Sequence, residues 1–244
     1  MVLKDKVVII MGASSGIGAA TVEVLAKNNA KLVIAARRKE RLEKFNEKYP
    51  NTAITAVKAD VTNFEDVQAV VDSAYDRYGR IDVMFNNAGI MPINSLAKGQ
   101  RQEWQKILDV NVMGVLNGIA AVLPIMIKQQ LGHIIATDSV AGHVVVPNLA
   151  VYNGSKFAVR AIMEGLRQEQ YSNNIKTSII SPGAVATELY QSINDPQKRQ
   201  NEIEVEKQIG LSAKNIAQAV AYVIDTPKRV NVNEIIVRPI GQAV

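Results

Sequence analysis

The fold of this chain is decided by Val7-Val8-Ile9-Ile10-Met11 and the turn directly after it, Gly12-Ala13-Ser14-Ser15-Gly16-Ile17-Gly18. Five consecutive apolar residues predict a short strand that is buried on both faces. The residues from Ile17 to Lys27 then predict a helix. Glycines let a backbone approach a pyrophosphate closely, and the free N–H groups at a helix start attract it. The stretch therefore predicts a nucleotide site. An ordinary tight turn is the alternative interpretation, because the spacing is G-x-x-x-G-x-G and the general dinucleotide fingerprint is G-x-G-x-x-G.

Outward from this turn, strand-like and helix-like segments alternate along the chain. Such alternation is typical of parallel strands joined by right-handed helical crossovers. It predicts a single-domain, Rossmann-type, doubly wound parallel sheet of about seven strands with helices on both faces. The expected strands are Val7–Met11, Leu32–Ala36, Ile54–Ala59, Ile81–Phe85, His133–Thr137, Lys176–Ser181 and Glu234–Arg238; the expected helices are Ile17–Lys27, Arg38–Tyr49, one opened by a capping box at Thr62-Asn63-Phe64-Glu65, Trp104–Lys128 and Tyr152–Tyr171.

One segment departs from this alternation. The stretch from Gln191 to Gly210 is polar, charged and poor in strand formers. We expect a helical or mobile insertion, spanning about residues 188–212, near the carboxyl edge of the sheet, where lids often lie. The remainder of residues 1–244 is expected to form one nucleotide-binding domain.

Composition excludes several classes of site. The chain of 244 residues has no cysteine and two histidines, so disulfides, thiolate nucleophiles and a cysteine- or histidine-rich metal site are not expected. No separate signal peptide and no uninterrupted apolar run of about 18 residues stand out, which favours a soluble cytoplasmic protein. The net charge of +5 is dispersed among acidic residues, and no nucleic-acid motif accompanies it, so neither nucleic acid nor membrane is an expected partner.

The end of the second strand bears on the choice of nucleotide. NAD sites usually place an acidic residue there, about 20 residues past the glycines. This chain has Arg37 and Arg38 instead, and a guanidinium fork suits a 2′-phosphate. Ser14 could add a hydroxyl contact. The pair predicts NADP(H), with a solvated pair of arginines as the alternative.

A second cluster of residues carries chemistry. Tyr152 and Lys156 are four residues apart, so they share one face of a helix, and Ser139 precedes the tyrosine by 13 positions. A phenol normally titrates near ~10, and a neighbouring ammonium group favours its ionised form. Together with the nucleotide turn, this spacing indicates a nicotinamide-dependent oxidoreductase that takes a small carbonyl or alcohol substrate.

These motifs, in this order, resemble the short-chain dehydrogenase/reductase family over nearly the whole chain. The resemblance assigns catalytic positions to Asn111, Ser139, Tyr152 and Lys156. It assigns cofactor positions to Gly12, Ser14, Ser15, Gly16, Ile17, Gly18, Arg37, Arg38, Asp60, Val61, Asn87, Ala88, Gly89, Tyr152, Lys156, Pro182, Gly183, Val185 and Thr187. Met11 departs from the pattern, because family members usually carry threonine before the first glycine.

The resemblance also implies roles. Tyr152 is the general acid in carbonyl reduction and the general base in alcohol oxidation, and Lys156 lowers its pKa and binds the nicotinamide ribose. Ser139 binds the substrate oxygen, and Asn111 holds a water that links Lys156 to solvent. Family members are usually homotetramers or homodimers, so symmetric assembly is implied.

Some positions leave alternatives open. Asp138 stands where members commonly have serine, and we expect it to point away from the site and bond to the backbone. His143 is expected on a surface loop, although the substrate pocket is within its reach, and Met91, Val145 and Tyr190 are candidate pocket-lining residues. The segment Val232–Pro239 resembles, more loosely, a bacterial subgroup with 3-hydroxy acid and serine dehydrogenases and the clavulanate-forming reductase. A dehydrogenase of a 3-hydroxy acid such as serine and a non-catalytic NADP(H)-binding regulator are the alternative functions.

Overall fold

A computed structural model describes residues 3–243. Its centre is one sheet of seven parallel strands in the order β3-β2-β1-β4-β5-β6-β9. The order reverses between β1 and β4, and ligands bind at such a reversal, outside the carboxyl ends of the strands. The strands are β1 (Val7–Met11), β2 (Lys31–Ala36), β3 (Ile54–Lys58), β4 (Val83–Asn86), β5 (Gly132–Thr137), β6 (Ile175–Pro182) and β9 (Glu234–Val237).

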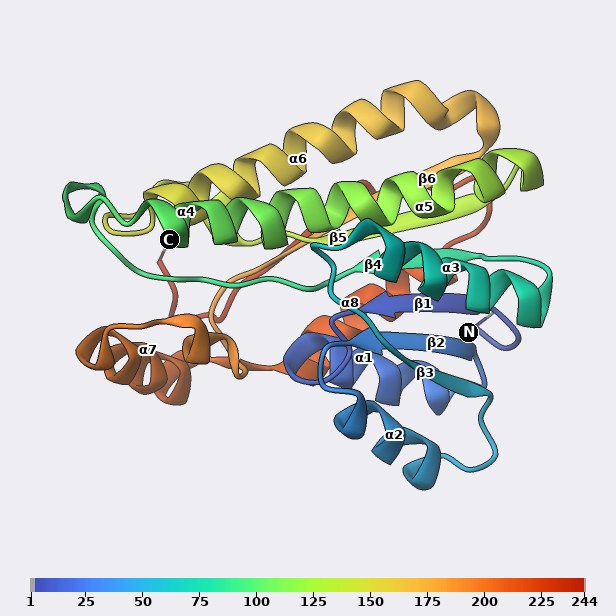
Figure 1. The fold of residues 1–244 in the computed structure, drawn as a ribbon, viewed down its shortest axis with the longest axis horizontal. Coiled ribbons are helices and arrows are strands. Elements are labelled where there is room, and N and C mark those ends of the chain that lie inside the picture. Colours follow the sequence, from blue (N-terminus) through green and yellow to red (C-terminus); the bar gives the residue numbers. More distant parts are fainter. Residues whose placement is uncertain (1–2, 244) are drawn as a thin grey trace.

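Helices cover both faces of this sheet (Figure 1). Helices α1, α2 and α8 bury their apolar sides on one face, and α3, α5 and α6 bury theirs on the other. The doubly wound α/β prediction is thereby confirmed. The helices are α1 (Gly16–Ala26), α2 (Lys39–Lys48), α3 (Phe64–Tyr78), α4 (Arg101–Leu108), α5 (Gly114–Gln129), α6 (Ala150–Gln170), α7 (Pro196–Ile209) and α8 (Ala213–Asp225).

The apolar run of β1 explains why the sheet needs two layers of helices. Successive side chains of a strand point to opposite faces. Val8 and Ile10 therefore pack in the core under α1 and α8, while Val7, Ile9 and Met11 pack in the core under α3 and α5. All five residues are buried, as the uninterrupted apolar pattern predicted.

Helix α8 lies outside every helix that the sequence predicted, and two further details differ from the sequence expectation. Helix α3 begins one residue later than the predicted capping box, since Asn63 is its N-cap and accepts a hydrogen bond from the Asp66 N–H at 2.8 Å. Thr62 instead binds the carboxylate of Asp60. The predicted long helix is also interrupted by a π-helical turn, Asp109–Met113, which joins α4 to α5.

The continuous helical stretch Arg101–Gln129 is long and apolar enough to cross a membrane, unlike any other helix among residues 3–243. Core helices satisfy the same criterion, and half of its most apolar window is buried inside this protein. Val115, Val122 and Met126 of this stretch pack in the core against the sheet. The apolar side of this helical stretch therefore forms part of the core.

The segment after β6 forms a small unit beyond the carboxyl ends of the strands (Figure 1). β7 (Val185–Ala186) and β8 (Leu211–Ser212) pair in parallel as a separate two-stranded sheet. Between them lie a 3-10 turn, Leu189–Ser192, and helix α7. Asp195 caps α7 by accepting hydrogen bonds from two N–H groups, and Pro196 occupies its first turn.

Candidate active site

The glycine-rich turn brings three parts of the backbone very close together. Gly12 has φ +82, and a Cβ atom there would lie 2.7 Å from the backbone nitrogen of Ala88. A Cβ atom on Gly18 would lie 2.1 Å from the carbonyl oxygen of Gly12 and 2.7 Å from Nδ2 of Asn87. Gly16, with φ +54, lies against the side chain of Thr187. Only glycine fits these positions.

The start of α1 is available to an anion. Its N-cap residue, Ser15, makes no side-chain capping bond, and the first turn holds no acidic residue. The N–H groups of that turn and the positive end of the helix dipole are therefore not neutralised by a side chain. Close glycine packing beside an uncapped helix start is what a pyrophosphate group requires, so these residues fit a dinucleotide.

Asn87 and Thr137 connect the glycine-rich turn to Lys156. Asn87 Nδ2 donates to the carbonyl of Gly12 at 3.0 Å, and its Oδ1 accepts from Thr137 Oγ1 at 2.9 Å. The carbonyl of Thr137 in turn accepts from Lys156 Nζ at 2.7 Å. The nucleotide turn and the helix that carries Tyr152 are thus held in one hydrogen-bonded chain.

The two arginines after β2 lie in different surroundings. Arg37 is exposed, whereas Arg38 Nη2 donates to Ser14 Oγ at 3.2 Å and to Ser15 Oγ at 3.0 Å. Arg38 Nη1 also donates to Glu188 Oε2 at 3.0 Å. The structure therefore brings Arg38, and not Arg37, to the nucleotide turn.

Arg41 is a second cation at this position that the sequence analysis missed. Its Nη1 donates to both carboxylate oxygens of Glu188, at 2.8 and 2.7 Å. The hydrogen bond from Arg41, followed by that from Arg38, outweighs burial and lowers the pKa of Glu188. Arg41 follows Arg38 by one turn of a helix, and this spacing could have identified it.

The remaining residues that were predicted to bind the cofactor lie after the carboxyl ends of the strands or at the start of α1. Asp60 accepts hydrogen bonds from the backbone and hydroxyl groups of Thr62, and Val61 packs on Gly114. Ile17 packs partly buried against the core, and Ala88 and Gly89 follow β4 beside the glycine turn. A Cβ atom on Gly89 would lie 3.5 Å from Asn111 Oδ1 and 4.0 Å from Lys156 Nζ, so both side chains lie beside Gly89.

The segment from Pro182 to Thr187 is held from the C-terminal side. Gly183 donates its N–H to Val237, and Gln242 Oε1 accepts from the Ala184 N–H at 2.8 Å. Pro182 and Val185 are buried. The Thr187 N–H donates to Glu206 Oε2 of α7 at 3.2 Å. Burial raises the pKa of Glu206 to about 7.

Tyr152 lies in the first turn of α6 and is buried together with Lys156 one turn later. Lys156 Nζ lies 5.8 Å from the centre of the Tyr152 ring. Burial raises the pKa of Tyr152, and a hydrogen bond with Ser139 acts in the opposite direction. Burial also lowers the pKa of Lys156 to about 8. Desolvation of the phenol therefore dominates in this structure, and the lowering of the tyrosine pKa by Lys156 stays a prediction.

Asn111 lies in the π-helical turn and is 1% exposed. Its side chain accepts from the Ile90 N–H and donates to the Ile90 carbonyl, both at 2.9 Å. It also donates to Ser155 Oγ at 3.1 Å. Asn111 is thus fixed between the loop after β4 and helix α6.

Among the candidate lining residues, Met91 and Tyr190 pack with Tyr152 in a small apolar cluster that also contains Ile193. Ser192 tethers this region, since its hydroxyl accepts from the Met91 N–H at 2.8 Å. Val145 does not belong to it and is 72% exposed. Val145 is thus no part of an apolar core, and its lining of a substrate pocket stays a prediction.

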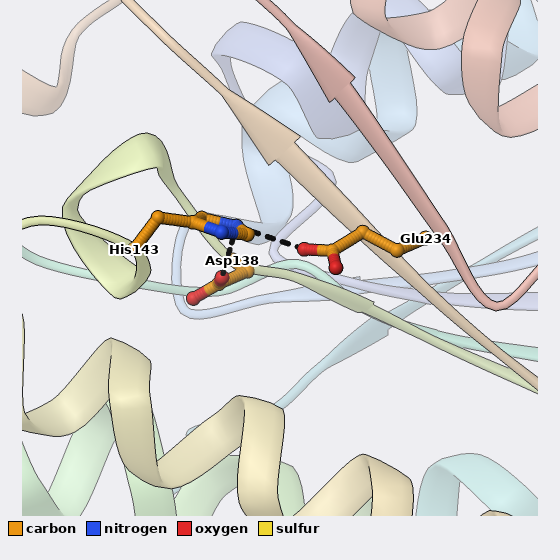
Figure 2. A group of neighbouring side chains, drawn as sticks. All are labelled: Asp138, His143 and Glu234. Carbon is orange, nitrogen blue, oxygen red and sulfur yellow. Dashed lines mark ion pairs between the residues drawn. The ribbon is translucent and has the colours of Figure 1, made fainter. Parts of the chain in front are cut away.

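Next to Ser139 in the sequence, Asp138 and nearby His143 form a cluster with Glu234 of β9 (Figure 2). His143 Nε2 lies 2.8 Å from Glu234 Oε1 and 3.8 Å from Asp138 Oδ2. The hydroxyl of Ser181 donates to Asp138 Oδ2 at 3.3 Å and lies 3.0 Å from Glu234 Oε1. His143 is therefore a largely buried member of this cluster and not the surface residue that was expected.

Asp138 also differs from its expected environment, because side chains and not only backbone groups surround its carboxylate. Burial raises its pKa to about 6, while Lys156 acts in the opposite direction. Arg160 of α6 donates to the carbonyl of Gly142 at 2.9 Å and lies 3.6 Å from Glu234. The turn that follows Ser139 is thus attached to β6, β9 and α6.

Comparison with known proteins agrees with this arrangement. A family model described as short chain dehydrogenase matches residues 6–198. An uncharacterized oxidoreductase of Staphylococcus saprophyticus is 51% identical over 243 residues, which cover 99% of this chain and 98% of that protein.

Two solved structures extend the comparison. The closed form of serine dehydrogenase complexed with NADP+ has a TM-score of 0.90 and 26% identity, over 98% of this chain and 96% of that one. A short chain dehydrogenase/reductase from Burkholderia phymatum in complex with NAD has a TM-score of 0.88 and 27% identity, over 97% and 90%. With the family model matching most of its length, the chain belongs to the short-chain dehydrogenase family and is an oxidoreductase of that type.

Proposed function

We propose that the chain is an NADP(H)-dependent oxidoreductase that moves a hydride between nicotinamide and a carbonyl or secondary alcohol of a small molecule. The observation that carries the proposal is the hydrogen-bonded chain from Gly12 through Asn87 and Thr137 to Lys156. It holds a dinucleotide-type turn and a buried tyrosine–lysine pair in fixed relation. A neighbouring structure with NADP+ and another with NAD support a nicotinamide cofactor.

The preference for NADP(H) rests on Arg38. Its guanidinium group lies beside the hydroxyls of Ser14 and Ser15, at the end of the strand where NAD sites usually have an acid. Arg41 adds a second positive charge at the same place. A 2′-phosphate would meet two guanidinium groups and two hydroxyls there.

Tyr152 is the proton donor in this proposal. Because burial raises its pKa, the phenol keeps its proton at neutral pH. In the reducing direction a bound nicotinamide cofactor would supply the hydride to the carbonyl carbon. The O–H bond of Tyr152 breaks as the substrate oxygen takes the proton, and Ser139 donates a hydrogen bond to the same oxygen while negative charge develops on it.

Lys156 and Asn111 return the proton to the tyrosine. The pKa of Lys156, lowered by burial to about 8, keeps its ammonium form dominant at neutral pH and still able to release a proton. Asn111 and Lys156 both lie beside Gly89, and the proposed relay needs a water that bridges them. In the oxidising direction the same groups would take the proton from the substrate alcohol.

A dehydrogenase of a 3-hydroxy acid such as serine is a second candidate. The fold overlaps the NADP+ complex of serine dehydrogenase with a TM-score of 0.90. Serine and other 3-hydroxy acids therefore belong in the substrate panel, assayed by NADP+ reduction. If NADPH binds and no substrate turns over, the protein is instead a non-catalytic NADP(H)-binding regulator.

The test is oxidation of NADPH and of NADH, followed at the nicotinamide absorbance, over aldehydes, ketones, diketones and keto acids. We expect turnover with NADPH and at least tenfold less with NADH. The Tyr152→Phe variant serves as the matched inactive control. NADPH binding measured by calorimetry without turnover of any compound, in either direction, would refute the catalytic proposal.

A further inference from the structure

Glu188 occupies the position that the proposed 2′-phosphate would take. Its two carboxylate oxygens accept hydrogen bonds from Arg41, at 2.8 and 2.7 Å, and one of them also accepts from Arg38 at 3.0 Å. Arg38 in addition donates to Ser14 and Ser15. A carboxylate held by two guanidinium groups uses the donors that a phosphate would use.

The carboxylate comes from the opposite side of the nucleotide turn. Residues 38 and 188 are 150 positions apart, and the adjacent Thr187 packs against Gly16 within the turn. Glu188 therefore connects the segment leading to α7 with the arginines after β2. The side chains of Glu188 and Arg38 are 32% and 38% exposed, so the ion pair lies at the mouth of this site and not in the core.

A 2′-phosphate cannot share this place with Glu188. Two guanidinium groups carry a charge of +2, and the carboxylate leaves +1. A phosphate group of charge near −2 would be repelled by Glu188 and would compete for the same N–H donors. A cofactor with a free 2′-hydroxyl carries no such charge and meets no such conflict.

We infer that Glu188 is a specificity-determining residue which acts as an internal counter-anion: it holds Arg38 and Arg41 in the free enzyme, must leave when a 2′-phosphorylated nucleotide binds, and so reduces the preference for NADPH over NADH. The inference rests on the proposed function, because it assigns the same two arginines to the 2′-phosphate. It deepens that function by naming the residue that opposes the preference.

The displacement of Glu188 reaches the segment that precedes α7. Thr187 is bonded through its N–H to Glu206 of α7, and its hydroxyl accepts from the Leu189 N–H at 3.2 Å. A carboxylate that moves away from Arg38 and Arg41 frees the start of the Leu189–Ser192 turn. Binding of the 2′-phosphate therefore changes hydrogen exchange in residues 188–192, whereas NADH changes it less.

The test is calorimetric titration of wild type and Glu188→Gln with NADPH, NADH and 2′,5′-ADP. Glutamine keeps the size of the side chain and removes its charge. We expect NADPH and 2′,5′-ADP to bind Glu188→Gln about five- to tenfold more tightly than wild type, on the scale of losing one or two part-exposed ion pairs. NADH affinity should change less than twofold. Glu40→Gln is the matched control, since Glu40 is an exposed acid in the first turn of α2, between Arg38 and Arg41 in sequence.

Each other outcome overturns the inference. Equal NADPH affinity of wild type and Glu188→Gln means that the carboxylate does not compete. Weaker NADPH binding means that Glu188 positions the arginines for the phosphate, and weaker NADH binding means that it holds the ribose hydroxyl. A Glu188→Ala variant with the same melting temperature as wild type must repeat the result. Wild type that binds neither nucleotide would refute the proposed function as well, whereas an unchanged NADPH-to-NADH ratio refutes only the role of Glu188.

Discussion

Replacing Asp138 by asparagine makes the stability of the protein less dependent on pH. Asp138 is 2% exposed, and burial raises its pKa from an ordinary value of 3.8 to about 6. That difference corresponds to about 3 kcal/mol, which ionisation of this carboxyl group costs the folded state. Asparagine has nearly the same shape and does not ionise, so the variant lacks this cost.

The sign follows from the two protonation equilibria. Below about pH 4 the carboxyl group is protonated in the folded and in the unfolded chain, and its ionisation costs nothing. Between about pH 4 and pH 6 the unfolded chain releases the proton first, so the free energy of unfolding falls as the pH rises. Above about pH 6 both states are ionised and the full cost of about 3 kcal/mol is present.

The assay is urea unfolding of wild type and Asp138→Asn from pH 4.5 to pH 8. The free energy of unfolding of the variant minus that of wild type should rise through the acidic half of this range by up to about 3 kcal/mol and then level off. His143, 3.8 Å from Asp138, titrates nearby, so the same pair is also compared in a His143→Gln background. A difference that stays constant with pH in both backgrounds would refute the buried-carboxylate reasoning.

Three further predictions concern single side chains. Tyr152→Phe should reduce turnover at least a thousandfold and leave the Kd of NADPH within about threefold, because the ring remains and only the proton donor is lost; a matching loss of binding would show a structural role. Arg38→Ala should weaken NADPH binding by about ten- to a hundredfold, whereas replacement of the exposed Arg37 by alanine should change it less than twofold. Calorimetry measures both variants, and equal losses of affinity would contradict the prediction. Gly18→Ala places a methyl group 2.1 Å from a backbone carbonyl and should lower the free energy of unfolding by about 2 kcal/mol or more, whereas Gly165→Ala, with nothing within 4 Å in α6, should not destabilise; chemical denaturation tests the pair.

Local sequence patterns were sufficient for most of the elements and for the placement of several residues of the proposed site. An all-apolar strand, a glycine turn and a helical i, i+4 pair are properties of a few adjacent residues. They predicted β1, the turn after it, and the shared face of Tyr152 and Lys156, all of which lie where expected.

Contacts between distant segments could not be predicted in this way. Glu188 meets Arg38 across 150 positions, and Glu234 meets His143 through the pairing of β9 with β6. The pKa of Tyr152 depends on distant contacts in the same way. The sequence shows a lysine next to it on the helix, but desolvation depends on every residue packed around the phenol.

The π-helical turn Asp109–Met113 allows one helix to serve two partners that need different faces. An additional residue in a helix turns everything after it by about 100°. In the structure α4 contacts α6, while α5 contacts α3 and lays Gly118 against Asn86. Removing one residue from the turn would therefore replace the π-helical turn with regular α-helical hydrogen bonding. It would also move Asn111 out of its place between Ile90 and Ser155, so a regular helix and the geometry of the proposed site are opposed in this protein.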